Sequence, residues 1–350
     1  MIKYCNEYWY DVRNVLKCVP NIEKLSSKRI LITGATGLIC SAVVELLFSL
    51  NKNGANIKLF LAGRNKERVE KRFYQFTEGK DFFFVKYDAT VVSELDVEVD
   101  YIIHGACNAN PEAYRLQPVE TMLSNLVGLN CLLSLAVKKK AKRVLYISSS
   151  EVYGSISEIR PYCEEDYGYV DILNIRASYP SSKRAAETMC VSYNSEFDLD
   201  TVIVRPGHIY GPSITQTDMR ATAEFTRNVV SGRNIVMKSV GTQLRSYCFS
   251  LDCASAILTV LIEGKTCNAY NISNKDSICT IRDIAESMAN REGKKIIFQD
   301  ATANERLGFN LMSNSSLNSR KIEQLGWKAI FTLEEGVART IEYYMKEKIG

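Results

Sequence analysis

Residues 29–37 read RILITGATG, and this stretch decides the fold. Five mostly apolar residues predict a buried strand, and the glycines after it predict a tight turn. The apolar pattern of residues 41–54 (SAVVELLFSLNKNG) then predicts a helix. Such a turn lets a pyrophosphate lie against a helix N-terminus, where free N–H groups and the helix dipole favour an anion. We expect these residues to contact a dinucleotide: Gly34, Thr36, Gly37, Leu38 and Ile39.

Outward from this turn, short apolar runs alternate with helical patterns. The runs at 57–63, 82–89, 101–106, 143–149 and 200–207 predict further strands, and residues 121–140 and 181–197 predict long helices. Wholly apolar strands that alternate with helices indicate a parallel sheet covered on both faces. The fold class is therefore predicted to be α/β, a Rossmann-type doubly wound parallel sheet.

Three regions follow from this pattern. Residues 1–27 form an N-terminal extension, whose aromatic residues predict a helix packed on the body or at a subunit contact. Residues 28–205 form the dinucleotide-binding domain. Residues 206–350 form a smaller, mixed substrate-binding lobe that is interleaved with the first domain. Helical patterns at 222–232, 253–264 and 280–293 and short strands at 234–239 and 269–273 are expected in this lobe.

Composition excludes several classes of function. The net charge is only +4, so we expect no nucleic-acid and no membrane partner. Eleven cysteines without CxxC spacing and only two histidines predict no metal site and a reducing compartment. The N-terminus is polar and aromatic, unlike a signal peptide, and no apolar stretch approaches the ~20 residues of a spanning helix. A cytoplasmic protein is expected.

The choice between NAD and NADP stays open in the sequence. An acid normally ends the second strand of proteins that bind NAD, where it bonds the ribose. Here that strand ends with Ala62, and Arg64 follows close behind. Arg64 could hold the 2′-phosphate of NADP, or could simply be solvated at the start of a helix. Asp88 is a candidate for the adenine amino group, and Ala106 and Asn125 are further expected cofactor contacts.

A catalytic pattern lies farther along the chain. Tyr179 and Lys183 are four residues apart, which places both side chains on one face of a helix. A lysine ammonium and the charge of a nicotinamide ring stabilise a phenolate, so this tyrosine can act as a base near neutral pH. The preceding strand ends in the serines 148–150, and a hydroxyl there can hydrogen-bond the substrate oxygen beside Tyr179.

With these residues in place, the chain from about Lys28 to Ala289 resembles the extended short-chain dehydrogenases, which include sugar-nucleotide epimerases, dehydratases and decarboxylases. Within that family it is most similar to the UDP-glucuronic acid decarboxylases. The matching stretches are SSEVYG (149–154), EEDYG (164–168), RASYPSSKRAAETMCVSY (176–193) and GTQLRSYC (241–248).

The resemblance implies a role for each matching residue. Tyr179 and Lys183 are the redox pair, and Ser149 is the hydroxyl beside them. Ser150 and Glu151 match the Ser-Glu pair of the decarboxylases, whereas the dehydratases carry Asp-Glu. The implied cofactor is NAD or NADP, and the implied substrate is a nucleoside-diphosphate sugar.

Three residues of the smaller lobe are expected at the substrate. Arg245 matches an active-site arginine of the family, and Arg220 is expected to face the cofactor region. Arginine suits both positions because its forked donors pair well with phosphate. His208 stands where the decarboxylases have asparagine, and it is either a substrate contact or a buried core histidine.

The expected reaction begins with oxidation of the sugar at C4 by the bound cofactor. Decarboxylation like that of UDP-glucuronate is the main interpretation. A nucleotide-sugar 4-epimerase or an NADPH-dependent 4-keto-sugar reductase would use the same opening step. A non-catalytic binding relative is the remaining alternative, and the intact Ser149, Tyr179 and Lys183 oppose it.

A homodimer is expected from the resemblance, through the helix of residues 121–138 and the helix that carries Lys183. Both helices carry apolar residues around much of their surface, which predicts a second partner besides the sheet. The apolar residues are Met122, Leu126, Leu129 and Leu133 on the first helix, and Ala185, Met189 and Tyr193 on the second.

Overall fold

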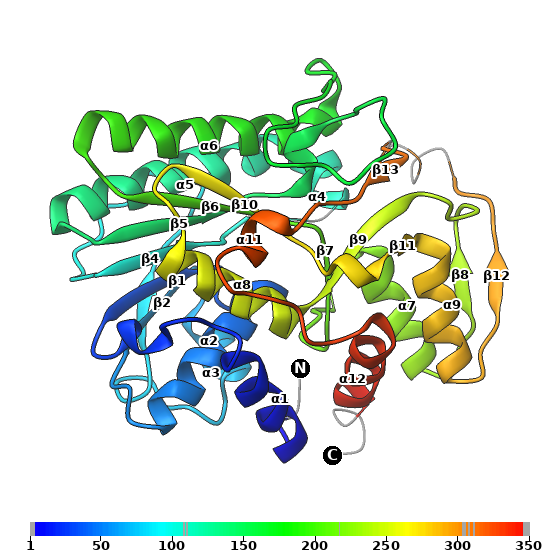
Figure 1. Cartoon of the computed structure of the whole chain (residues 1–350), viewed down its shortest axis with the longest axis horizontal. Helices are drawn as coiled ribbons and strands as arrows, with labels where there is room; N and C mark the ends of the chain where they lie inside the picture. Colours follow the sequence, from blue (N-terminus) through cyan, green and yellow to red (C-terminus); the bar gives the residue numbers. More distant parts are fainter. Residues whose placement is uncertain are drawn as a thin grey trace.

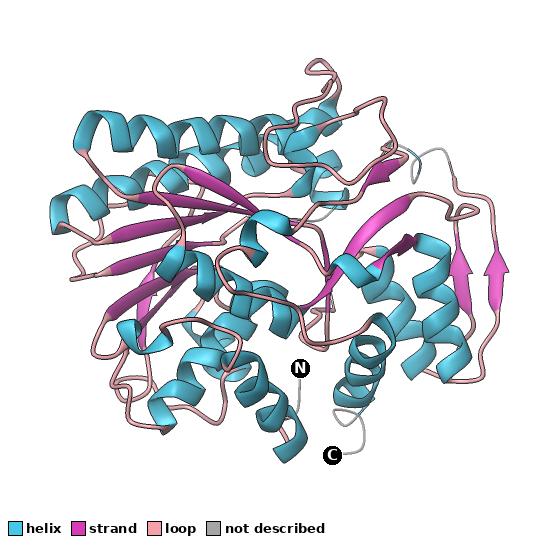
Figure 2. Cartoon of the chain, in the orientation of Figure 1, coloured by secondary structure: helices cyan, strands magenta, loops and turns pink. Residues whose placement is uncertain are grey.

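A wholly parallel sheet of seven strands organises the chain (Figures 1 and 2). The computed structural model describes residues 4–345, apart from 108, 110, 217, 303–305, 307–308 and 311. The spatial order is β10-β6-β5-β4-β1-β2-β3. The strands are β1 Arg29–Thr33, β2 Lys58–Gly63, β3 Phe83–Lys86, β4 Tyr101–His104, β5 Arg143–Ile147, β6 Thr201–Pro206 and β10 Asn268–Ile272. This confirms the predicted doubly wound fold class.

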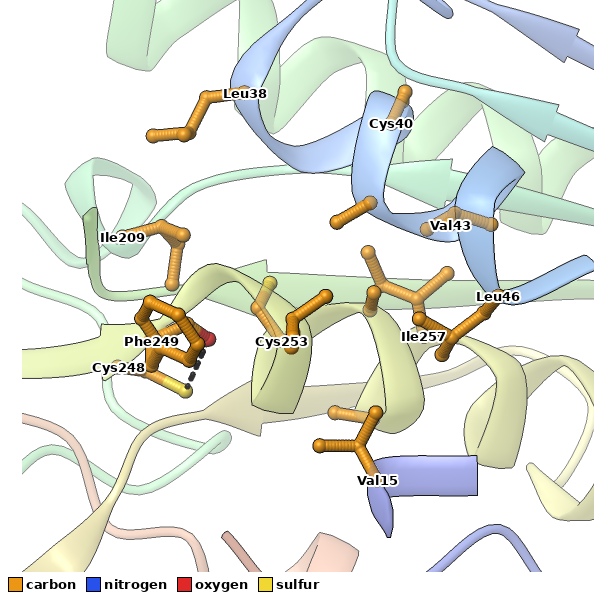
Figure 3. Close-up of a cluster of buried hydrophobic side chains, with 14 of the residues drawn as sticks. Val15, Leu38, Cys40, Val43, Leu46, Ile209, Cys248, Phe249, Cys253 and Ile257 are labelled. Carbon is orange, nitrogen blue, oxygen red and sulfur yellow. Dashed lines mark hydrogen bonds between the residues drawn. The ribbon is translucent and has the colours of Figure 1, made fainter. Parts of the chain in front are cut away.

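Helices cover both faces of this sheet (Figure 1). α5 (Pro118–Lys139) and α6 (Ser178–Phe197) pack together on one face of the sheet, over an apolar core. α2 (Leu38–Lys52), α3 (Lys66–Arg72) and α8 (Ser250–Glu263) contribute to the core on the other face. In Figure 3, Cys40 and Val43 of α2 lie above Cys253 and Ile257 of α8, so helices far apart in the sequence share this core.

Two elements predicted in the smaller lobe lie with the main sheet instead: one is a strand of it, and the other is a helix packed beside it. The strand at 269–273 is β10, which pairs in parallel with β6 and forms the edge of the seven-stranded sheet. The helix at 253–264 is part of α8, which packs against α2 beneath the same sheet. α8 is buried along nearly its whole length, and Tyr270, Asn271 and Ile272 of β10 are buried as well.

The smaller lobe lies at the carboxyl edge of the large sheet, on the right of Figure 1. β9 (Leu244–Phe249) is its central strand and pairs with β7 (His208–Tyr210), β11 (Ile278–Thr280) and β13 (Asn314–Ser315). β8 (Ile235–Met237) pairs with β12 (Ile296–Phe298). The lobe's helices are α7 Ala221–Val230, α9 Ile281–Arg291, α11 Arg320–Glu323 and α12 Leu333–Met345.

The N-terminal extension forms α1 (Asn6–Leu16), which packs on α2 and α8. The fully buried Glu45 of α2 accepts hydrogen bonds from Tyr4 and Tyr8 and pairs with Arg72 of α3 at 2.6 Å. At the other side of α1, Asp11 accepts a hydrogen bond from Tyr343 of α12. The extension thus connects the dinucleotide-binding domain to the last helix. Of the two predicted arrangements, it is therefore the helix packed on the body of the protein.

The helix α5 corrects two sequence predictions. By length and composition α5 could cross a membrane, contrary to the prediction that no stretch is long enough, but more than half of it is buried inside the protein. Leu129 and Leu133, two of the apolar residues on which the prediction of a second partner rested, are fully buried in the core between α5, α6 and the sheet. Met122 and Leu123 are 39% and 38% exposed, so these two residues, and not Leu129 and Leu133, belong to the exposed apolar face of α5.

Candidate active site at the carboxyl edge of the sheet

The turn after β1 has the shape expected of a phosphate-binding loop. Gly34 has φ +68°, and a Cβ there would lie 2.7 Å from the carbonyl oxygen of Gly105, so only glycine fits. Gly37 is the N-cap residue of α2, so no side chain of the N-cap bonds the first N–H groups of the helix. Thr36 lies in this same turn, and Leu38 and Ile39 are the first two residues of α2. The free N–H groups of this turn fit the pyrophosphate of a dinucleotide.

Cys40 replaces the last glycine of the pattern, and Gly105 compensates for it. A Cβ on Gly105 would lie 2.4 Å from the Cys40 sulfur, so the thiol fills space that the second glycine leaves empty. Burial of this sulfur raises the pKa of the Cys40 thiol to about 12, which keeps it neutral. Ala106, an expected cofactor contact, follows directly and donates its N–H to the Thr33 hydroxyl at 3.1 Å.

The adenosine side of the predicted site holds Arg64 and Asp88. Arg64 follows β2, and its half-exposed guanidinium lies 3.3 Å from Glu120 of α5. The Asp88 carboxylate accepts hydrogen bonds from the backbone and the hydroxyl of Thr90, at 3.0 and 2.8 Å. The Thr90 backbone bond lowers the pKa of Asp88. Asp88 is therefore an ionised acceptor fixed at the end of β3.

Asn125 lies beneath the site and is bonded within the protein. Its amide donates to the Thr121 carbonyl at 2.9 Å and to the Ser182 hydroxyl at 3.1 Å, and it accepts from Tyr146. Both amide hydrogens are thus in use. Asn125 therefore connects α5 with α6 and β5 through these bonds.

Tyr179 and Lys183 lie in the first turns of α6 and are both buried. The Lys183 ammonium lies 5.7 Å from the Tyr179 ring centre and donates to the Ile147 carbonyl at 2.7 Å. Burial raises the pKa of Tyr179 and lowers the pKa of Lys183, while the hydrogen bond with Ser149 opposes the shift at Tyr179. An added positive charge beside the phenol, such as an oxidised nicotinamide ring carries, would lower the tyrosine pKa again.

The Ser-Glu pair lies beside this tyrosine, in the short helix η2 (Ser150–Tyr153). Ser149 caps η2 by accepting a bond from the Glu151 N–H at 3.2 Å, and Ser150 is buried. Glu151 forms an ion pair of 2.7 Å with Arg176, and both side chains are more than four-fifths buried. The structure therefore brings all five predicted catalytic residues to one place.

Two residues of the site were not predicted. Arg176, in the short helix η3 (Ile175–Ala177), lies 4.6 Å above the ring of Tyr114. Tyr114, from α4 (Pro111–Leu116), stacks on Tyr179 with ring centres 4.4 Å apart. A continuous stack thus joins Glu151 to Tyr179 through Arg176 and Tyr114. Arg176 stands three residues before Tyr179, and that spacing was the available signal.

Arg245 is a buried cation that lacks a carboxylate partner among the residues that the structure describes. It is 2% exposed, and its guanidinium donates to the carbonyl oxygens of Leu244 and Met312, both at 2.9 Å. Burial lowers the pKa of Arg245. Buried charges are normally paired, so this position favours an anionic ligand. Arg220, by contrast, forms a forked ion pair with Asp218 at 2.5–3.2 Å.

His208, the first residue of β7, lies within electrostatic range of both arginines. Burial, followed by the charges of Arg245 and Arg220, lowers the pKa of His208 to about 3, so the ring is neutral at physiological pH. Its Nδ1 is buried and bonds nothing within the described part of the chain. An unsatisfied buried ring nitrogen favours substrate contact over the alternative of a hydrogen-bonded core histidine.

Known proteins match this chain along most of its length. The sequence model of the NAD dependent epimerase/dehydratase family matches residues 30–273. UDP-glucuronic acid decarboxylase 6 of Arabidopsis thaliana is 31% identical over 314 residues, which cover 89% of this chain and 87% of the relative. UDP-glucuronic acid decarboxylase 1 of Xenopus tropicalis is 29% identical over 96% of this chain and 77% of its own.

Solved structures confirm the fold. The dTDP-glucose 4,6-dehydratase of Bacillus anthracis, in complex with NAD, has a TM-score of 0.75 at 20% identity and covers 92% of this chain and 98% of its own. The UDP-N-acetylglucosamine 4-epimerase of Methanobrevibacter ruminantium has a TM-score of 0.78 at 18% identity, over 91% and 99% of the two chains.

Proposed function

Because this chain belongs to the NAD-dependent epimerase/dehydratase family, we propose that it oxidises a nucleoside-diphosphate sugar at C4 and decarboxylates it, as on UDP-glucuronate. One observation carries the proposal: Tyr179 and Lys183 are buried beside Ser149, next to the Glu151–Arg176 ion pair. The first three residues serve oxidation. The Glu151–Arg176 pair supplies the proton donor at C5 that decarboxylation needs in addition.

In the proposed oxidation, Tyr179 removes the proton of the C4 hydroxyl, which Ser149 holds by a hydrogen bond. Lys183 stabilises the phenolate by its charge. When bound, the nicotinamide cofactor accepts the C4 hydrogen as hydride and later returns it. The Gly34–Gly37 turn fits such a cofactor, because Gly34 has a positive φ and no side chain of Gly37 caps the start of α2.

In the proposed second half, a ketone at C4 makes the C5 carboxylate a β-keto acid. The bond from C5 to the carboxyl carbon breaks, carbon dioxide leaves, and its electron pair forms an enolate. A proton must then reach C5, and Glu151 with Ser150 is the candidate donor, directly or through water. Arg176 orients Glu151 and fixes it against Tyr114.

The substrate proposal rests on the smaller lobe. The diphosphate of the sugar nucleotide would pair with the positive charge of Arg245, because a guanidinium binds phosphate through two donors. His208 would then form one hydrogen bond with the same substrate through its Nδ1, as donor or as acceptor according to the tautomer. Arg220 already has Asp218 as its partner, so its contribution is a smaller one.

A 4-keto-sugar reductase is the second candidate, because the end of β2 lacks an acid and carries Arg64. Such an enzyme would consume NADPH with each turnover. A decarboxylase or an epimerase would retain its cofactor with no net change.

Incubation with a panel of sugar nucleotides, with and without added NAD(P), separates these candidates when products are weighed by mass spectrometry. The proposal expects carbon dioxide loss from UDP-glucuronate by the wild type and no turnover by Tyr179→Phe. Turnover only of sugar nucleotides that lack a sugar carboxylate would favour the epimerase over the decarboxylase. Net oxidation of NADPH would favour the reductase.

We also propose a homodimer, in the cytoplasm. The exposed apolar residues of α5 and α6 support the dimer, among them Met122, Leu123 and Val191. None of the eleven cysteines forms a disulfide in the part of the chain that the structure describes, which supports a reducing compartment. Sedimentation at micromolar concentration tests the dimer, and a strictly monomeric species would contradict it.

A further inference from the structure

The end of β2 is where the adenosine ribose of a bound dinucleotide would lie. β1 and β2 pair in parallel with Thr33 opposite Ala62, so the Gly34 turn and Gly63 leave the sheet side by side. β3 continues this edge, with Lys86 opposite Gly63. In this fold the pyrophosphate lies on the glycine turn and the ribose reaches the end of the second strand. Gly63, Arg64 and Lys86 therefore surround the 2′ position.

Within the described part of the chain, no carboxylate occupies the place that binds a ribose 2′-hydroxyl. The side chain of Ala62 is buried in the core, and Gly63 has no side chain. A Cβ built on Gly63 would meet nothing within 4 Å, so the space above it is open. The two acids of this region are already engaged, Asp88 with Thr90 and Glu120 with Arg64.

Positive charge fills this region instead. The Arg64 side chain is 59% exposed, and it touches Glu120 at one point, 3.3 Å away. Exposed pairs of this kind contribute little, so a dianion can replace Glu120 as partner. The ammonium of Lys86 donates to the Arg64 backbone carbonyl at 2.6 Å, which fixes the loop and adds a second charge. Both cations act on Asp88, which shows that they lie within electrostatic range of it.

We infer that this enzyme binds NADP(H) in preference to NAD(H), with the 2′-phosphate held by Arg64 over the open space at Gly63. A phosphate dianion suits a guanidinium because two parallel hydrogen bonds form. A ribose hydroxyl would find no acceptor there. The inference rests on the proposed function for one point only, that a nicotinamide dinucleotide binds at the Gly34 turn.

Titration of the full-length protein, stripped of nucleotide, with NADPH and with NADH tests the inference through nicotinamide fluorescence. We expect NADPH to bind about ten- to a hundredfold more tightly, the range for hydrogen bonds to a charged group. The preference should shrink with added salt, because Arg64 is exposed. Equal binding, or tighter binding of NADH, would overturn the inference.

Three variants sharpen the test. Arg64→Ala should weaken NADPH binding by about tenfold or more and leave NADH binding unchanged. Gly63→Asp should reverse the preference, since its carboxylate accepts from a ribose hydroxyl and repels a phosphate. Lys58→Ala is the matched control, because it removes one charge from the opposite end of the same strand. An equal loss of both nucleotides in Arg64→Ala would also overturn the inference.

The outcomes separate this inference from the proposed function. Tight NADH binding together with turnover of a sugar nucleotide would overturn the inference and leave the function standing. Failure of both dinucleotides to bind would overturn the inference and the function together. If Gly63→Asp fails to fold, as judged by circular dichroism, the Arg64→Ala and Lys58→Ala pair still decides.

Discussion

Replacement of Glu151 by glutamine separates the two roles that the structure allows this residue. Glutamine keeps the size of the side chain and one acceptor for Arg176, and it removes the ionisable carboxyl group. Glu151 could act as the proton donor at C5, or it could only anchor Arg176 at 2.7 Å and so hold Tyr114 against Tyr179. The proposed mechanism requires the first role.

The two roles predict different magnitudes. Loss of a general acid–base group costs about 10²–10⁴-fold in kcat. Loss of the anchor alone shifts groups that still have their other contacts, so it should cost about tenfold or less. Arg176→Gln is the matched control, since it removes the anchor and keeps the carboxylate. Glu151→Gln should therefore be the slower enzyme by at least about tenfold.

The assay combines product formation from UDP-glucuronate with the ultraviolet absorbance of reduced nicotinamide. A block after oxidation should make that absorbance build up in Glu151→Gln and not in Arg176→Gln. The thermal midpoint of each variant monitors folding. Equal losses in the two variants, or near wild-type activity in Glu151→Gln, would refute the assignment of Glu151 and favour the epimerase or reductase.

Three further predictions concern stability and assembly. Arg72→Met leaves Glu45 buried without its cation and should lower the free energy of unfolding by about 3–5 kcal/mol in urea titrations, whereas a loss below about 1 kcal/mol would show that the pair is unimportant. His208 has a pKa of about 3 in the folded state and about 6.5 in the unfolded chain, so the unfolded state takes up its proton first as the pH falls. The wild type should therefore lose about 1 kcal/mol relative to His208→Asn between pH 7.5 and pH 5.5, and a pH-independent difference would contradict that pKa. Met122→Glu places a charge on the exposed face of α5 and should shift sedimentation toward the monomer; an unchanged dimer would place the interface elsewhere.

The sequence predicted well what depends on local pattern. The strand at 29–33, the glycine turn and the helix after it form as expected, because their apolar periods and glycine positions act within a few residues. Tyr179, Lys183 and Ser149 come together because the order of strands and helices in a doubly wound sheet determines which loops share an edge.

Other features depend on contacts between distant segments and could not be read in advance. Tyr114 reaches Tyr179 only because α4 packs next to η3. Gly105 compensates for Cys40 from 65 positions away in the chain, through one methyl-sized space. β10 joined the main sheet although its short apolar run fits either lobe equally well. In each case tertiary packing decided, and no local signal carries that information.

The central claim is oxidation at C4 followed by loss of carbon dioxide and protonation at C5. Turnover of UDP-glucuronate in heavy water tests it most directly, with the product analysed by mass spectrometry and nuclear magnetic resonance. The account predicts a UDP-pentose that carries one deuterium, at C5, and the original hydrogen at C4. A product that keeps its carboxylate and gains no carbon-bound deuterium would contradict the account.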